Sequence, residues 1–164
     1  MGTHQNQGSD PDRVSNRRGR IAHTALRTLM ARIETLPASD ADEFVTAASC
    51  VLHELRKLDM TTSAAVDLGG PTPALTLSAI RRTYTALLSR VAQSPHATLG
   101  QRLAAARHHA ELTAYEAAHA CGVAFDVVVG VEAGLPVPEG ATAALEGLVG
   151  QLGWATQVPG QPAA

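Results

Sequence analysis

The sequence holds few aromatic residues: two Phe, two Tyr and one Trp, or 3% of its 164 residues. Hydrophobic residues nevertheless make up 45% of the chain, so its core has to be built mainly from Ala, Leu and Val. Sheets favour aromatic and β-branched residues, whereas alanine and leucine are strong helix formers. The composition therefore predicts an all-α protein.

Cysteine and long apolar runs are also scarce. Cys50 and Cys121 lie far apart and in no paired spacing, which is typical of reduced thiols and unlike a disulfide framework. The sequence has no run of about 18 uncharged apolar residues that would cross a bilayer. The segment 1–12 also lacks the apolar stretch of a signal peptide. These features predict a cytoplasmic protein without membrane contact.

Motifs that carry catalysis are missing as well. The Gly69-Gly70 pair is followed by Pro71, not by the lysine and hydroxyl residue of a phosphate-binding loop. No nucleophile elbow and no HExxH zinc motif occurs. Four residues carry imidazole or thiolate groups that could ligate zinc, but their spacing matches no zinc-binding motif: His108, His109, His119 and Cys121. We predict no enzyme activity, no cofactor and no metal site.

Hydrophobic periodicity predicts helices in the first part of the chain. Residues 1–16 are polar and predict a disordered N-terminal arm. The region 17–95 contains three amphipathic stretches, in which apolar residues recur at three- and four-residue spacing: 17–36, 44–58 and 77–91. A loop is predicted between them at 59–74, where glycines and prolines interrupt the pattern. We expect this helical region to serve dimerisation or effector contact.

The last third of the chain predicts shorter helices with tight turns: 98–110, 114–121, 125–133 and about 139–151. Thr113 followed by Glu116 forms a capping box, so a helix begins at Ala114. Gly122 is a turn glycine that ends this helix, and a second short helix runs toward Gly134. The pattern is a helix, a tight turn and a helix, followed by a closing helix and a disordered tail at 154–164.

The stretch LGQRLAAARHHAELTAYEAAHACGVAFDVVVGVEAG resembles the Cro/repressor-type (XRE) helix-turn-helix family. The matching positions follow one another without a gap: Leu99, Gly100, Arg102, Leu103, Arg107, Leu112, Thr113, Glu116, Ala118, Gly122, Val123, Val128, Val131, Glu132 and Gly134. The resemblance extends over about 98–153, roughly a third of the chain. It implies a compact bundle of four to five helices.

The resemblance further implies a transcriptional regulator that binds double-stranded DNA, is nucleoid-associated, and acts as a homodimer on two half-sites. Helix 125–133 would lie in the major groove, and the start of helix 114–121 would contact phosphate. The candidate DNA-binding residues are then Arg102, Arg107, Thr113, Ala114, Tyr115, Ala124, Phe125, Asp126, Val127, Val129 and Gly130.

The expected reading helix departs from the family's pattern. The family usually has glutamine at the position of Ala114, and polar or basic residues at most positions that are apolar here. Valine and alanine can contact a thymine methyl group, but they form no hydrogen bonds with base edges. Asp126 would be repelled by phosphate unless it accepted a hydrogen bond from a cytosine amine.

Charge is distributed unevenly along a chain whose formal net charge is −2. Residues 97–153 hold two basic residues against six acidic ones, a net charge of −4. Residues 11–32 hold six arginines against one aspartate, a net charge of +5. DNA affinity depends on the neutralisation of phosphates, so a candidate accessory basic arm is predicted at Arg13, Arg17, Arg18 and Arg20.

An alternative function comes from a different class of protein. The same helical fold could have lost specific DNA readout and could bind a protein partner through the apolar face of helix 125–133. The residues of that strip would be Phe125, Val127 and Val129. This alternative explains the acidic character of the module, and Phe125 at the exposed start of the helix is its most informative residue.

Overall fold

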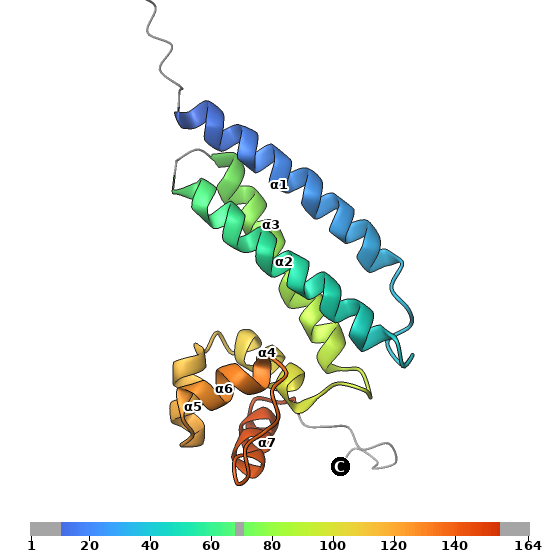
Figure 1. Cartoon of the computed structure of the whole chain (residues 1–164), viewed down its shortest axis with the longest axis vertical. Coiled ribbons are helices and arrows are strands. Elements are labelled where there is room, and N and C mark those ends of the chain that lie inside the picture. Colours follow the sequence, from blue (N-terminus) through green and yellow to red (C-terminus); the bar gives the residue numbers. More distant parts are fainter. Residues whose placement is uncertain (1–10, 68–70, 155–164) are drawn as a thin grey trace, which may run out of the picture. The chain divides into compact units, whose positions relative to one another are not determined.

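The computed structural model describes residues 11–67 and 71–154, which form seven α-helices and no β-strand (Figure 1). The predicted all-α class is therefore confirmed. The helices are α1 (Pro11–Glu34), α2 (Phe44–Val66), α3 (Pro71–Ala92), α4 (Leu99–His109), α5 (Ala114–Cys121), α6 (Phe125–Glu132) and α7 (Thr142–Gln151).

The described residues divide into two compact units, one within residues 11–36 and 47–84 and the other within 37–46 and 85–154. The second unit thus begins earlier than the expected module at 98. Contacts of the 37–46 segment explain the difference. The Arg90 guanidinium lies 5.2 Å from the centroid of the Phe44 ring, and His96 Nε2 lies 3.2 Å from Asp42 Oδ1.

In the first unit, α1 begins at Pro11, so the predicted disordered arm is wrong for residues 11–16. Proline suits the first turn of a helix, and the polar residues that follow are packed. Ser15 is fully buried, and its hydroxyl donates to Ala65 O of α2 at 2.9 Å. Gly19 is also buried. Residues 1–10 lie outside the described residues.

The predicted loop at 59–74 is wrong for residues 59–66 and 71–74, because α2 continues to Val66 and α3 begins at Pro71. Residues 68–70 of that loop lie outside the described residues. The buried Thr62 hydroxyl donates to Leu58 O, one turn back in α2, at 2.6 Å. Asp59 accepts a 2.9 Å hydrogen bond from Arg81 Nε of α3. Pro71 and Pro73 fall in the first turn of α3, where a missing N–H breaks no helical bond. The prolines therefore mark the start of a helix.

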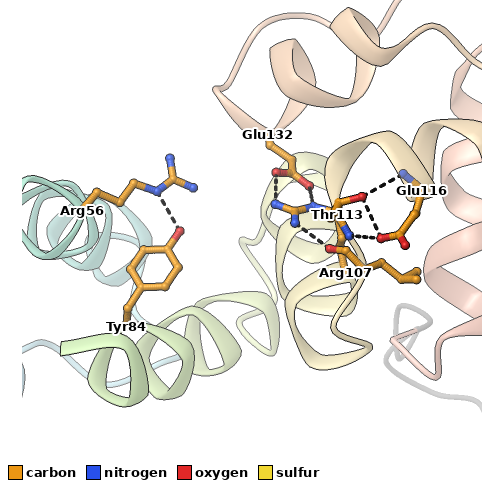
Figure 2. A network of polar contacts seen from close by, with 7 residues as sticks. Arg56, Tyr84, Arg107, Thr113, Glu116 and Glu132 are labelled. Carbon is orange, nitrogen blue, oxygen red and sulfur yellow. Dashed lines mark hydrogen bonds and ion pairs between the residues drawn. The ribbon is translucent and has the colours of Figure 1, made fainter. Parts of the chain in front are cut away.

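Polar contacts also connect α2 and α3 further along the first unit. Arg56 Nε donates to the Tyr84 hydroxyl at 2.9 Å (Figure 2). The same guanidinium lies 5.4 Å from the centroid of the Tyr84 ring, a distance at which a cation and an aromatic face attract each other. Tyr84 is thus a buried structural residue.

In the second unit, α4 packs against α6 and α7, and α5 packs against the same two helices (Figure 1). Their shared core is aliphatic and consists of Leu103, Ala117, Ala118, Val128, Val131, Ala141, Leu145, Leu148 and Val149. Trp154 packs against this core, and its backbone N–H donates to Val149 O at 2.9 Å. The predicted disordered tail is therefore wrong at Trp154, and its remaining residues, 155–164, lie outside the described residues.

Within the described ranges, no single helix is long and apolar enough to cross a membrane. The pair α5 and α6 reaches the required length and composition only when both helices are counted together across a bend of 116°.

Candidate functional site

The turn between α5 and α6 consists of Gly122, Val123 and Ala124, and the helix axis changes direction across it by 116°. Gly122 has φ 66° and ψ 28°, a left-handed conformation that strongly favours glycine. Val123 N–H donates to Ala118 O at 3.1 Å, and its side chain packs against the core. The predicted helices 114–121 and 125–133 are confirmed to within one residue.

The predicted capping box at the start of α5 is confirmed (Figure 2). Thr113 Oγ1 accepts from Glu116 N–H at 3.1 Å, and Glu116 Oε2 accepts from Thr113 N–H at 2.7 Å. Hydrogen bonds from Thr113 lower the pKa of the Glu116 carboxyl below its ordinary value. The bond from the Thr113 backbone has the larger effect, and the bond from its hydroxyl has the smaller one. The amides of Ala114 and Tyr115 belong to the first helical turn and have no intrahelical partner.

Arg107 lies inside the second unit, with only 13% of its side chain exposed against 9% for Glu132. Its Nε and Nη2 donate to the two Glu132 carboxylate oxygens at 2.7 and 2.8 Å (Figure 2). Its Nη1 donates to Leu112 O at 2.9 Å. These bonds connect α4 to the end of α6 and to the turn before α5. The structure thus gives Arg107 an internal role in place of the expected DNA contact.

Arg102 is also engaged internally. Its Nη1 donates to Ala97 O, just before α4, at 2.8 Å, and its buried Nε has no hydrogen-bond partner among the described residues. Neither arginine of residues 97–153 is therefore an exposed cation. The exposed Asp and Glu side chains of that segment are Glu111, Glu116, Asp126, Glu139 and Glu146. No exposed Arg or Lys balances them within the segment, all of which the structure describes.

The exposed side chains of α6 and of the turn that precedes it are those of Ala124, Phe125, Asp126 and Val129, which we term the α6 face. Phe125 is 48% exposed and Val129 is 42% exposed. Val127 instead packs against the core, so the predicted strip of three apolar residues is wrong at that position. The reason is helical geometry, because Phe125 and Val129 are four residues apart and share a side of the helix, whereas Val127 lies about 200° around the helix from each of them.

Four other predicted site residues lie at the start of α5 and within α6. Thr113 and Tyr115 are exposed at the start of α5, whereas Ala114 is half-buried against the core. Gly130 is half-buried, and a Cβ there would lie 3.3 Å from Leu135 Cδ1. Gly130 therefore leaves room for the Leu135 side chain. Of the residues expected to contact bases, only those of the α6 face are exposed.

The predicted basic arm is not an arm. Its described residues, Arg13, Arg17, Arg18 and Arg20, are exposed side chains of α1.

In the part of the chain that the structure describes, no group of three or more His, Cys, Asp or Glu residues could hold a metal ion. His109 instead stands edge-on to Trp154, with ring centroids 6.0 Å apart. Partial burial raises the pKa of the Cys121 thiol.

Comparison with known proteins gives two matches. A family model described as an N-terminal domain matches residues 29–98. An uncharacterised protein of Mycolicibacterium smegmatis is 41% identical over 125 residues, which are 75% of this chain and 97% of that protein. A stretch of that length has to extend beyond residues 29–98, so the similarity is not confined to the family model. No solved structure matches the chain.

Proposed function

This chain belongs to the family of that uncharacterised Mycolicibacterium smegmatis protein, and we propose that it is a DNA-binding transcriptional regulator of the XRE helix-turn-helix type. One observation carries the proposal: α5 and α6 meet at 116° across a turn with a left-handed glycine. Helix-turn-helix motifs join their helices at about 90–120° through a turn of about three to four residues. In such motifs the second helix enters the major groove.

The start of α5 supplies a place for phosphate in this proposal. The amides of Ala114 and Tyr115 lie at the positive end of the helix dipole, which favours an anion. Thr113 is exposed beside them. Arg102 and Arg107 are not part of the proposed interface, because their guanidinium groups are bonded internally. A homodimer would place two such sites on the two halves of a palindrome.

Base recognition by the α6 face would depend mainly on apolar contacts. Phe125, Val129 and Ala124 are apolar, and the thymine methyl group is the apolar feature of the major groove. Asp126 is the only charged residue of the face, and its carboxylate can accept from the N4 amine of cytosine. We therefore expect α6 to favour sites that present thymine methyl groups.

Retention of genomic DNA fragments at two salt concentrations tests the proposal. The wild-type protein is expected to retain a selected subset of fragments and to release them as salt rises, because phosphate contacts are salt-sensitive. The double variant Phe125→Ser/Val129→Ser should lose the selection. The matched control Met60→Ser/Leu75→Ser alters two exposed apolar residues of the first unit, 73% and 71% exposed, and should select as the wild type does.

A protein-interaction module is the second candidate function. It is favoured by the absence of any exposed Arg or Lys in residues 97–153 and by the exposed apolar side chains Phe125 and Val129. An exposed aromatic residue next to an aliphatic one is a typical protein-binding feature. If the wild-type protein retains no DNA at low salt, the regulator proposal fails and this second function is favoured.

A further inference from the structure

One side of α1 carries a row of arginines, which we term the basic stripe: Arg13, Arg17, Arg20 and Arg27. Their spacing of four, three and seven residues places them on one side of a helix with 3.6 residues per turn. All four are exposed. The opposite side of the helix is buried and consists of Ser15, Gly19, Ala22, Leu26 and Leu29.

No acidic residue interrupts the basic stripe. The sequence from Arg13 to Ile33 contains neither Asp nor Glu. Thr24 and Ala31, which share the side of the stripe, are exposed and uncharged. A rise of about 1.5 Å per residue gives the stripe a length of roughly 21 Å. The stripe therefore carries positive charge and no negative charge along its length, with the uncharged Thr24 between Arg20 and Arg27.

The second unit lacks such a surface. Residues 97–153 have a net charge of −4, and the guanidinium groups of Arg102 and Arg107 are bonded inside the unit. Phosphate contacts supply most of the sequence-independent affinity of DNA-binding proteins. If the protein binds DNA through α6, another element has to supply this electrostatic part of the affinity. Among the described residues, the largest group of exposed arginines lies on α1.

We propose that the basic stripe binds the phosphate backbone of double-stranded DNA. This inference rests on the proposed function and assigns the electrostatic part of DNA binding to a surface outside the α5–α6 pair. Duplex DNA carries one negative charge per about 1.7 Å, so a row of roughly 21 Å faces several phosphates. The planar guanidinium fork of arginine matches the geometry of phosphate oxygens.

The salt dependence of binding to a duplex of random sequence tests the proposal. The variant Arg17→Gln/Arg20→Gln/Arg27→Gln removes three charges from the stripe. The control Arg32→Gln/Lys57→Gln/Arg82→Gln removes three exposed charges that lie off the stripe, so both variants have the same net charge. The stripe variant should lower the slope of log K against log salt by about 3, since each phosphate that is no longer neutralised lowers it by about 1. The control should change the slope by less than about 1.

Each other outcome overturns the proposal. Equal slopes for the two variants would mean that overall charge matters and the stripe does not, while the proposed function would stand. Absence of wild-type binding to any duplex at low salt would remove both the stripe proposal and the regulator function. Wild-type binding to phosphatidylserine vesicles, to an acidic protein or to a second copy of the chain, without binding to the duplex, would assign the stripe to another partner.

Discussion

Gly100→Ala is expected to lower the free energy of unfolding of the second unit by about 3 kcal/mol or more, at the upper end of what overpacking costs. A Cβ at Gly100 would overlap the Val131 carbonyl oxygen and lie 2.8 Å from its carbonyl carbon. Both neighbours are backbone atoms of α6, so no side chain can move aside. The overlap can be relieved only if α4 and α6 move apart, and this movement would disrupt the candidate site on α6. Thermal unfolding followed by circular dichroism measures the loss.

Gly147→Ala is the matched control, because it adds the same methyl group to a helical glycine of α7 with nothing within 4 Å of the added Cβ. Replacing glycine with alanine inside an unobstructed helix stabilises it by about 0.5–1 kcal/mol. The two substitutions should therefore change stability in opposite directions. A Gly100→Ala variant as stable as the wild type would contradict the close approach of α4 to α6.

Arg107→Ala should cost about 3–5 kcal/mol of unfolding free energy, because it leaves the buried Glu132 carboxylate without its partner. The Arg107 guanidinium supplies both hydrogen bonds to that carboxylate and a third to Leu112 O. Its removal therefore loosens α4, the end of α6 and the turn before α5 together. Urea unfolding with a helical circular-dichroism signal measures the effect.

A double-mutant cycle separates this ion pair from simple loss of packing. Glu132→Ala is expected to be destabilising as well, since it leaves a buried guanidinium unpaired. The double variant Arg107→Ala/Glu132→Ala should be less destabilised than the sum of the two single variants, because neither charge is then left alone. Strict additivity would show that the two side chains do not act as a pair.

Local signals were sufficient to predict the short helices of the second unit. Thr113 and Glu116 fix the start of α5 through a reciprocal cap, and Gly122 fixes its end through a left-handed conformation. Both signals act within a few residues. The ends of α1 and α2 were mispredicted because contacts between helices determine them. Ser15 is polar in sequence but is buried against Ala65, and Thr62 is buried within the bundle.

The candidate site could be predicted only in part for the same reason. The exposure of Phe125, Asp126 and Val129 follows from helical periodicity, and the structure places all three on the exposed surface of α6. The role of Arg107 could not be read from its neighbours, because its partner Glu132 is 25 residues away. A basic residue near a predicted DNA interface looks like a phosphate contact until its partner in the fold is known.

Replacing thymine with uracil in a retained duplex tests most directly whether the α6 face reads DNA, because the change removes only the methyl groups from the major groove. Wild-type affinity is expected to fall about four-fold for each thymine methyl group that α6 touches, the equivalent of about 0.8 kcal/mol. The variant Phe125→Ser/Val129→Ser should bind both duplexes equally. Equal wild-type affinity for the thymine and uracil duplexes would contradict base reading by these side chains.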